Sequence, residues 1–377
     1  MTNSLNTISL PVSAVKTCLE AHMDTKRLHK KPILLLGAPG LGKSQVVKTI
    51  AAERNLKLYD LRLSRMEATD ISGLPFLDME RQKTVYFTPD FLPTEESYKA
   101  EGYKGAIIFL DELTQSDSSL QSVVLELVLD RSVGNYKVPD NVFIVAAGNR
   151  PEDNCGSYEL IASLLSRFIV FSVESDPSDW INWALFNNIH PSVIAFIKTH
   201  PEHLIGSFSE LTNEEPHLIS SSPRSWETVS TIVSEVQEDN IRQYLISGVV
   251  GLAAAQQFFF CLEQIEELAG MDEYLALAEK KDLKALVDLL PTKPAGLYGL
   301  SFSLPAFCST EKDYVNACYV FYAISTIEDH IPRGEIVLSS MLSLFKTLHS
   351  AKLTKIISKV CASKAYKAMR LDLDPSF

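Results

Sequence analysis

Continuous apolar runs recur along the first half of the chain, and turn-forming or polar residues bound each of them. Runs without polar alternation are typical of strands that are covered on both faces, as in a parallel sheet flanked by helices. Helical periods lie between the runs, so the pattern predicts a doubly wound α/β core with a five-stranded parallel sheet. The predicted strands are residues 33–37, 56–61, 106–110, 142–148 and 168–173.

Two segments interrupt this alternation of strands and helices. LPFLDMERQKTVYFTP, between the second and third strands, has two short extended arms around a charged turn. RSVGNYKVP, before the fourth strand, carries the turn signal Gly134–Asn135. Both segments predict hairpins that project from the core, with ordinary surface loops as the alternative.

Strand signals largely vanish after Pro177, and helical periods replace them. At the other end, Val12, Val15 and Leu19 have helical spacing and predict a helical lead-in. We expect four parts. They are this lead-in (residues 1–30), an α/β nucleotide-binding domain (31–176), a helical lid (177–237) and a C-terminal helical region (238–377).

The composition is that of an ordinary soluble globular protein, with 46% apolar and 22% charged residues. A net charge of −12 makes the whole molecule a poor general binder of nucleic acid. Residues 346–377 are the exception, since they carry seven lysines and arginines against two aspartates. A basic amphipathic helix there would dock on an acidic partner, an anionic membrane or nucleic acid. The alternative is a terminal helix packed by its apolar side, with solvated lysines.

The six cysteines are scattered, without a CxxC pair or a metal-ligand spacing. They predict reduced, mostly buried thiols in a cytoplasmic protein. No apolar run reaches the roughly 18–20 residues that a membrane span needs. The N-terminus lacks the basic and apolar regions of a secretory signal, which also favours the cytoplasm.

The segment GAPGLGKS follows the first predicted strand and fits the pattern G-x-x-x-x-G-K-[ST]. In such a loop, backbone N–H groups at a helix N-terminus surround a phosphate. Lys43 would reach the β- and γ-phosphates of a nucleotide, and the Ser44 hydroxyl would bind Mg²⁺. The predicted nucleotide-binding residues of this loop are Gly37, Ala38, Pro39, Gly40, Leu41, Gly42, Lys43, Ser44 and Gln45.

AIIFLDEL, at residues 106–113, supplies two acidic side chains at the end of a buried strand. Asp111 is expected to hold Mg²⁺ directly or through water. Glu112 is expected to polarise an attacking water, because hydrolysis needs a positioned base beyond the phosphates. A kinase or a simple GTPase does not require this adjacent glutamate, so the pair favours ATP hydrolysis.

Three further polar residues are candidates for the same chemistry. Asn149 ends the fourth predicted strand, where its amide would orient the water or sense the γ-phosphate. Arg167 precedes the fifth strand, at an edge from which it would enter a neighbouring subunit's site. Arg224 follows Pro223 at the start of a lid helix, where it would sense the γ-phosphate. The alternative for Asn149 is a turn residue. For Arg167 it is a solvated side chain, and for Arg224 it is a structural arginine paired to a carboxylate.

In this order the motifs resemble those of an AAA+ ATPase, and specifically of the MoxR family. The segments LRLSRMEATDISGLPF, DWINWALFNNIHPSVIAFIKTHPEHL and PRSWE resemble its bacterial and bacteriophage branch. GAPGLGKS, IIFLDE, AAGNR, LSRF and PRSWE carry the resemblance, which covers about residues 11–260. The family's insert in its second helix and its hairpin before the sensor-one strand correspond to about residues 72–90 and 131–139. The implied roles are Walker A for Gly37, Gly42, Lys43 and Ser44, Walker B for Asp111 and Glu112, sensor one for Asn149, arginine finger for Arg167 and sensor two for Arg224.

The resemblance implies a homo-oligomeric ring, usually of six subunits, that binds ATP and Mg²⁺ between neighbours. Family members commonly work with a partner that carries a von Willebrand factor A domain, and act as chaperone-like machines on protein clients. The projecting hairpins would then face the client, with Phe76, Leu77, Tyr86 and Phe87 as contacts. Packing within the protein is the alternative for these apolar residues.

Two other functions stay open. One is a nucleic-acid-directed motor that resembles the GTPase subunit of modification-dependent restriction systems, although the net charge and the lack of a recognisable DNA-reading domain disfavour it. The other is a nucleotide-gated assembly scaffold, in which ATP binding locks a complex and hydrolysis resets it.

Overall fold

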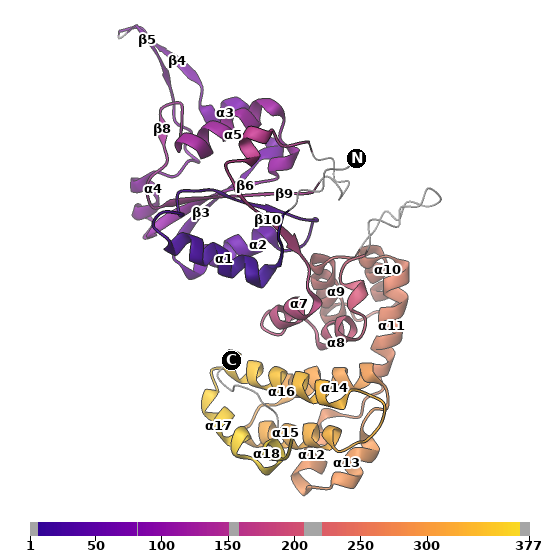
Figure 1. The fold of residues 1–377 in the computed structure, drawn as a ribbon. Helices are drawn as coiled ribbons and strands as arrows, with labels where there is room; N and C mark the ends of the chain where they lie inside the picture. Colours follow the sequence, from indigo (N-terminus) through magenta and orange to yellow (C-terminus); the bar gives the residue numbers. More distant parts are fainter. Residues whose placement is uncertain (1–6, 81, 151–157, 207–220, 370–377) are drawn as a thin grey trace. The chain divides into compact units, whose positions relative to one another are not determined.

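The computed structural model describes residues 7–80, 82–150, 158–206 and 221–369. The chain divides into two compact units, Met1–Asp176 and Pro177–Phe377. The first unit is built on a parallel sheet and the second is helical (Figure 1), and we call them the α/β unit and the helical unit. The predicted fold class is therefore confirmed.

A six-stranded sheet forms the centre of the α/β unit, with the strand order β1-β10-β2-β9-β6-β3 and parallel pairing throughout. All five predicted strands are present. The sixth, β1, lies in the expected helical lead-in and pairs with β10. The strands are β1 (Ser9–Pro11), β2 (Ile33–Leu36), β3 (Leu56–Arg62), β6 (Gly105–Asp111), β9 (Val142–Gly148) and β10 (Ile169–Glu174).

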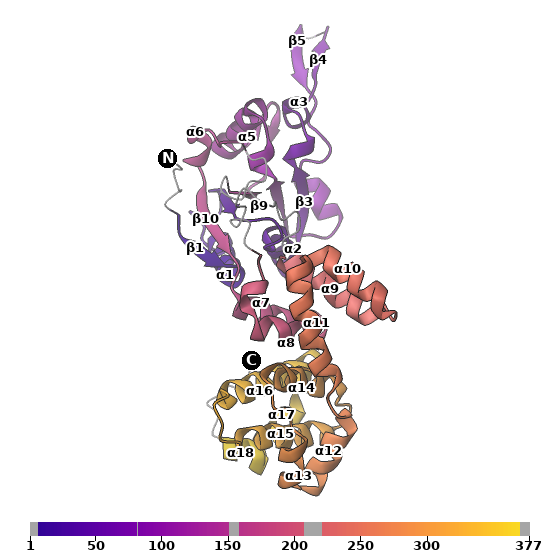
Figure 2. The ribbon, with the colours of Figure 1, turned by 90° about the vertical axis from the view of Figure 1, so that its right-hand side faces the viewer.

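Helices cover both faces of this sheet (Figures 1 and 2). Leu34 and Ile144 belong to the core that the sheet shares with helices α3 and α5. Their chain neighbours Leu35 and Val145 point to the opposite face and are buried as well. This burial on both faces explains the continuous apolar runs of the strands. The helical segments of the unit are α1 (Val12–Asp24), α2 (Lys43–Glu53), η1 (Leu63–Arg65), α3 (Ala68–Ser72), α4 (Glu95–Ala100), η2 (Leu113–Gln115), α5 (Ser118–Asp130) and α6 (Ala162–Leu165).

Both predicted hairpins are present as antiparallel pairs outside the main sheet. Strands β4 and β5 form the longer pair, which Figure 1 shows projecting away from the sheet. Strands β7 and β8 form a shorter pair between α5 and β9. The four strands are β4 (Pro75–Asp78), β5 (Lys83–Tyr86), β7 (Ser132–Val133) and β8 (Tyr136–Lys137).

One continuous apolar core runs through the described part of the helical unit. It includes Trp180 and Trp226 from the expected lid, together with Phe258 and Phe321 from the expected C-terminal region. The division of the unit at residue 237 therefore stays a prediction. The helices are α7 (Pro177–Ala184), α8 (Pro191–Thr199), η4 (Pro201–His203), α9 (Pro223–Glu235), α10 (Asp239–Val250), α11 (Leu252–Glu266), α12 (Met271–Lys280), α13 (Leu283–Leu289), α14 (Pro294–Phe307), α15 (Glu311–Ser325), α16 (Arg333–Ser350), α17 (Thr354–Ala362) and α18 (Lys364–Met369).

The expected C-terminal amphipathic helix is divided into the ends of α16, α17 and α18. Lys352, with φ of 57°, is in the left-handed conformation between α16 and α17, where a continuous helix cannot pass. Ile357 and Val360 of α17 are buried, while Lys355 and Lys359 are exposed. The segment thus packs by its apolar side and leaves its lysines in solvent, as the second sequence alternative states.

The buried cysteines are inert thiols. Burial raises the pKa of Cys261, Cys308 and Cys318 to about 12. The cysteines that the structure describes are all free, and Cys155 lies outside the described residues. Within the described ranges, no helix combines the length and the apolar character needed to cross a bilayer.

Candidate nucleotide-binding site

The glycine-rich loop joins the end of β2 to the start of α2. Gly42 has φ of 87°, a left-handed conformation that is costly for residues with a side chain. It precedes Lys43, the first residue of α2, and brings no side chain to cap the helix. The first N–H groups of α2 therefore face the loop, which is the arrangement that binds phosphate in proteins.

Lys43 is 8% exposed and lies over the loop that precedes it. Its Nζ donates to the carbonyl oxygens of Gly37 and Ala38, at 2.6 and 2.8 Å. The same Nζ is 3.3 Å from Oδ1 of Asn149, which follows β9. The predicted phosphate-binding lysine and the predicted sensor asparagine are therefore in contact. Of the other loop residues, the buried ones are Gly37, Ala38 and Leu41, the intermediate ones are Gly40, Gly42 and Ser44, and the exposed ones are Pro39 and Gln45.

Ser44 and Asp111 supply the oxygen atoms expected for a magnesium site. Ser44 Oγ donates to Asp111 Oδ2 at 2.9 Å, which joins the start of α2 to the end of β6. Among the described residues, no group of three or more His, Cys, Asp and Glu side chains could hold a metal ion. One hydroxyl and one carboxylate suit Mg²⁺, because this ion keeps several waters and binds phosphate oxygens as well.

The candidate base Glu112 follows Asp111 in a left-handed conformation, with φ of 60°. Its backbone N–H donates to Asp111 Oδ1 at 2.9 Å. Its side chain accepts a hydrogen bond from Ser64 Oγ, in the short helix η1 after β3. Ser64 was not predicted from the sequence, because serine after a strand is a common turn residue. In the structure, parallel pairing of Arg62 with Asp111 puts the residues after β3 and β6 at the same end of the sheet.

Thr114 is a second residue of the site that was not predicted from the sequence. It is 2% exposed, and its Oγ1 accepts a hydrogen bond from the backbone N–H of Asn149 at 2.9 Å. A side chain at Gly148 would clash here, since a Cβ atom would lie 2.6 Å from Thr114 Cγ2. The Gly148 carbonyl accepts from the Gly37 N–H at 3.2 Å. Thr114 therefore sets the position of Asn149 against the phosphate loop.

The two candidate arginines do not take part in this cluster. Arg167 is exposed between α6 and β10, and its backbone N–H donates to the Leu164 carbonyl oxygen at 3.0 Å. Arg224 is exposed at the second position of α9, in the helical unit. Burial raises the pKa of Glu227, one turn further on, and the charge of Arg224 opposes this shift. The finger and sensor roles of the arginines stay predictions.

The hairpin β7–β8 connects the projecting hairpin to the sheet. Asn135 Nδ2 donates to the carbonyl oxygen of Tyr86, in β5, at 2.9 Å. Arg131 Nη2 donates to the carbonyl oxygen of Val142, the first residue of β9, at 2.8 Å. Tyr136 donates its hydroxyl hydrogen to the Pro93 carbonyl at 2.9 Å, and burial raises the pKa of this phenol. The base of β4–β5 is thus tied to the strand that carries Asn149.

The candidate client-contact residues are on the projecting hairpin and are all exposed. The exposed fractions of Phe76, Leu77, Tyr86 and Phe87 are 57%, 66%, 40% and 60%. The Phe76 and Phe87 rings contact each other, with centroids 5.5 Å apart. This degree of exposure argues against packing within the chain as the role of these residues.

Comparison with known proteins identifies the class of this site. Residues 32–168 match the model of the AAA domain of the dynein-related subfamily. This segment begins one residue before β2 and ends one residue before β10. The chain therefore carries an AAA domain, and the cluster around Lys43 and Asp111 lies within the matched segment.

Individual relatives share parts of the chain. Midasin of Giardia intestinalis is 30% identical over 192 residues, which are 48% of this chain and 4% of Midasin. An uncharacterised protein of Methanocaldococcus jannaschii is 28% identical over 137 residues, 34% of either chain. The chain thus spans about a third or less of the length of these two curated relatives.

Two solved structures illustrate distant similarity of fold. NtrX of Brucella abortus has a TM-score of 0.37 at 16% identity, over 70% of this chain and 63% of NtrX. A RuvB mutant of Thermotoga maritima has a TM-score of 0.33 at 12% identity, over 78% of this chain and 74% of that one. At such scores the similarity carries no argument about function.

The hydrogen bond from Asn149 to Thr114 predicts the effect of Thr114→Val. Valine keeps the shape but leaves the Asn149 N–H without an acceptor, which costs about 1–3 kcal/mol. We expect ATP turnover to fall about tenfold in steady-state assays, while the nucleotide Kd stays within about twofold. Thr114→Ser restores the hydroxyl and is the matched control. Full turnover in a folded Thr114→Val protein would contradict the positioning of Asn149 by Thr114.

Proposed function

We propose that this protein is a ring-forming, Mg²⁺-dependent ATPase of the MoxR type, which couples ATP hydrolysis to the remodelling of a protein client. The observation that carries the proposal is the convergence of Lys43, Ser44, Asp111 and Asn149 at one edge of the sheet. The AAA domain match over residues 32–168 supports the same class of chemistry.

Each residue of the cluster has a role in the proposed hydrolysis. The N–H groups at the start of α2 bind the phosphates, and the Lys43 ammonium exchanges its carbonyl partners for phosphate oxygens. Ser44 and Asp111 would hold Mg²⁺, and this ion would supply positive charge beside the bound phosphates. Glu112 accepts a proton from the attacking water, and the Asn149 amide orients this water beside the γ-phosphate.

The contact between Ser64 and Glu112 adds a condition to this mechanism. A carboxylate that accepts a hydrogen bond from Ser64 has less capacity to accept the proton of a water. Glu112 therefore acts as the base when it leaves Ser64 or shares its second oxygen with the water. A ring in which the subunits hydrolyse ATP in turn requires this kind of control.

The exposure of Arg167 supports action between subunits. An exposed arginine at the edge of the α/β unit is available to a neighbouring copy, where it adds positive charge at the γ-phosphate of that copy's ATP. We propose a homo-oligomeric ring, six subunits being the usual number in the MoxR family. The proposed role of Arg224 is that of sensor two for the γ-phosphate.

The projecting hairpin is the proposed client contact. Its exposed residues Phe76, Leu77, Tyr86 and Phe87 offer an apolar surface to a protein client or to a partner with a von Willebrand factor A domain. Hydrogen bonds through Asn135 and Arg131 connect this surface to β9, and so to Asn149. Client binding and ATP turnover are therefore coupled through the α/β unit.

Two variants test the ATPase chemistry. Lys43→Ala removes the phosphate-binding cation, so nucleotide Kd should rise at least about 100-fold in fluorescence titrations. Glu112→Gln keeps the site but removes the base, so ATP should bind within about threefold of the wild-type affinity while turnover falls at least about 100-fold. Glu126→Gln, on the exposed side of α5, is the matched control. Substantial turnover by Glu112→Gln would refute the base assignment.

Mixed oligomers test the arginine finger. Arg167→Ala alone should turn over ATP at least about 100-fold more slowly than the wild type, because each site lacks the neighbour's cation. In mixed oligomers, the Arg167→Ala subunits keep an intact Walker B site, and neighbouring Glu112→Gln subunits supply Arg167 to it. Part of the ATP turnover should therefore return. Arg27→Ala is the control for loss of an exposed arginine. Wild-type turnover by pure Arg167→Ala would exclude the finger.

Capture of the client tests the remodelling function. Tagged Glu112→Gln held in ATP-Mg²⁺ should retain a discrete protein, identified by mass spectrometry. The same trap with Phe76→Ser and Phe87→Ser should lose it, while Leu129→Ser, also an exposed apolar residue, should not. Recovery mainly of DNA or of a nuclease, unaffected by the hairpin changes, would instead support a nucleic-acid-directed motor.

A further inference from the structure

Charge is segregated along the helical unit. From Ile336 to Met369 the chain carries six lysines and no aspartate or glutamate. From Gln243 to Glu279 it carries six acidic residues and no lysine, arginine or histidine. Because acidic and basic residues are otherwise interspersed along the chain, these two segments create surfaces of opposite sign on one unit.

The basic segment ends in exposed lysines, one between α16 and α17 and the others on α17 and α18. Lys359 is already neutralised by Glu311, with both Nζ–O distances at 2.7 Å. The other lysines of the surface are exposed and have no ion pair within the described part of the chain. We define the lysine surface by these residues, which are Lys352, Lys355, Lys364 and Lys367.

The acidic segment gives an acidic surface where α11 ends and α12 begins. Two of its carboxylates have partners within the unit, since Glu266 pairs with Arg242 at 3.4 Å and Glu279 with Lys312 at 2.5 Å. The remaining four are exposed and form no ion pair with any described residue. We define the acidic surface by these residues, which are Glu263, Glu267, Asp272 and Glu273.

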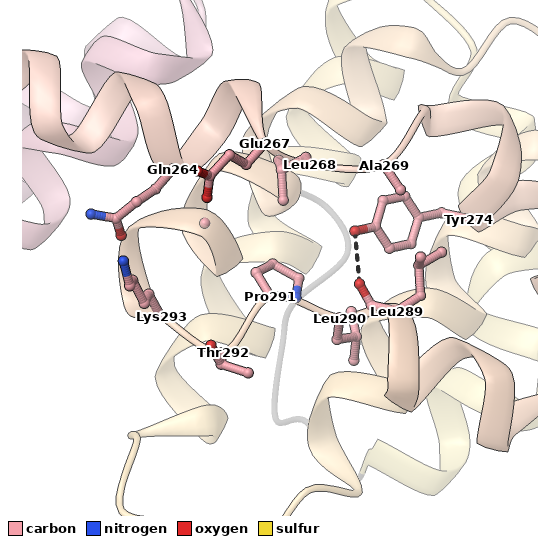
Figure 3. A pocket seen from close by; sticks show the side chains of 11 residues that line it. Gln264, Glu267, Leu268, Ala269, Tyr274, Leu289, Leu290, Pro291, Thr292 and Lys293 are labelled. Atoms are coloured by element: carbon pink, nitrogen blue, oxygen red, sulfur yellow. Dashed lines mark hydrogen bonds between the residues drawn. The ribbon is translucent and has the colours of Figure 1, made fainter.

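A groove of about 380 Å³ lies beside the acidic surface (Figure 3). Glu267 stands on its rim, and Leu268, Leu290 and Pro291 give it apolar walls. Lys293 also borders the groove, with its Nζ 5.3 Å from the centroid of the exposed Phe260 ring. A carboxylate rim over apolar walls suits the lysine side chain, which combines a charged end with an apolar stem.

We propose that copies of this chain associate through their helical units, with the lysine surface of one copy docked on the acidic surface and groove of the next. The inference rests on the homo-oligomer of the proposed function and names surfaces that hold it together. Figure 1 shows α17 and the α11–α12 turn on different sides of the unit, so the two surfaces pair between copies rather than within one. Contacts between two different surfaces repeat from copy to copy and close into a ring when the rotation permits.

The structure favours a second copy over a membrane or a nucleic acid as the partner. Ile357 and Val360 pack into the core, so α17 has no apolar face left to enter a bilayer. Tyr366 of α18 turns its ring to Phe345, with centroids 6.0 Å apart, and is not presented for stacking on bases. Four lysines face four carboxylates, none of them ion-paired among the residues that the structure describes, which makes the two surfaces of this chain complementary.

Charge reversal tests the inference. Lys355→Glu with Lys364→Glu turns the lysine surface negative, and Glu267→Lys with Glu273→Lys turns the acidic surface positive. Each double variant should associate at least about tenfold more weakly than the wild type in sedimentation at low salt with ATP-Mg²⁺. The quadruple variant has both surfaces reversed and should recover association to within about threefold of the wild type.

The controls separate this inference from the proposed function. Lys26→Glu with Lys31→Glu makes the same change in net charge as the lysine double variant, but in the α/β unit, and should leave association unchanged. Circular dichroism checks the folding of every variant. The proposed surfaces are wrong if the wild type forms oligomers that neither double variant weakens. They are also wrong if the quadruple variant associates as weakly as the double variants. Either result leaves the proposal of a homo-oligomeric ring unaffected. If the wild type never oligomerises with ATP-Mg²⁺, the ring itself fails. Loss of binding to duplex DNA or to anionic vesicles in the lysine variant, with unaltered self-association, also overturns the inference.

Discussion

Parallel pairing of the central strands is the constraint on which the candidate site depends. The register aligns Leu36 with Gly148, and Arg62 with Asp111. The carboxyl ends of β2, β9, β3 and β6 therefore lie together along one edge of the sheet. The residue after each strand is therefore held beside its neighbours by backbone hydrogen bonds, before any side chain contributes. The contacts of Lys43 with Asn149, and of Ser44 with Asp111, follow from this edge. Burial of the strands on both faces then fixes the edge as a rigid platform.

The same platform supports the projecting hairpin. A two-stranded hairpin is marginally stable by itself in water, and β4–β5 carries apolar side chains that are exposed. Its orientation therefore depends on its base, where the hydrogen bond from Asn135 to Tyr86 joins it to β7–β8. Arg131 continues this connection to β9. Hydrogen bonds therefore connect the base of the hairpin to β9, the strand that Asn149 follows.

Much of the α/β unit could be predicted from the sequence, because buried parallel strands leave continuous apolar runs and the phosphate loop has a characteristic spacing. Asp111 and Asn149 could be found for the same reason, since they follow such runs. Strand β1 could not, because three residues ending at Pro11 give no period to detect. Ser64 and Thr114 were missed because serine and threonine after a strand are common turn residues, and only the tertiary register reveals their partners Glu112 and Asn149. In the helical unit, periodicity predicted helices but could not show that one core joins them.

The two outermost strands of the central sheet have a further consequence for assembly. One edge is β1, which is three residues long and ends in Pro11, a residue without a backbone N–H. The other is β3, whose charged residues include Lys57, Asp60 and Arg62. Short, proline-containing or charged edge strands are the features by which sheet proteins resist the addition of a foreign strand. The central sheet is thus protected at both of its outer strands from the addition of a strand of another copy, so copies of the α/β unit do not extend one another's central sheets.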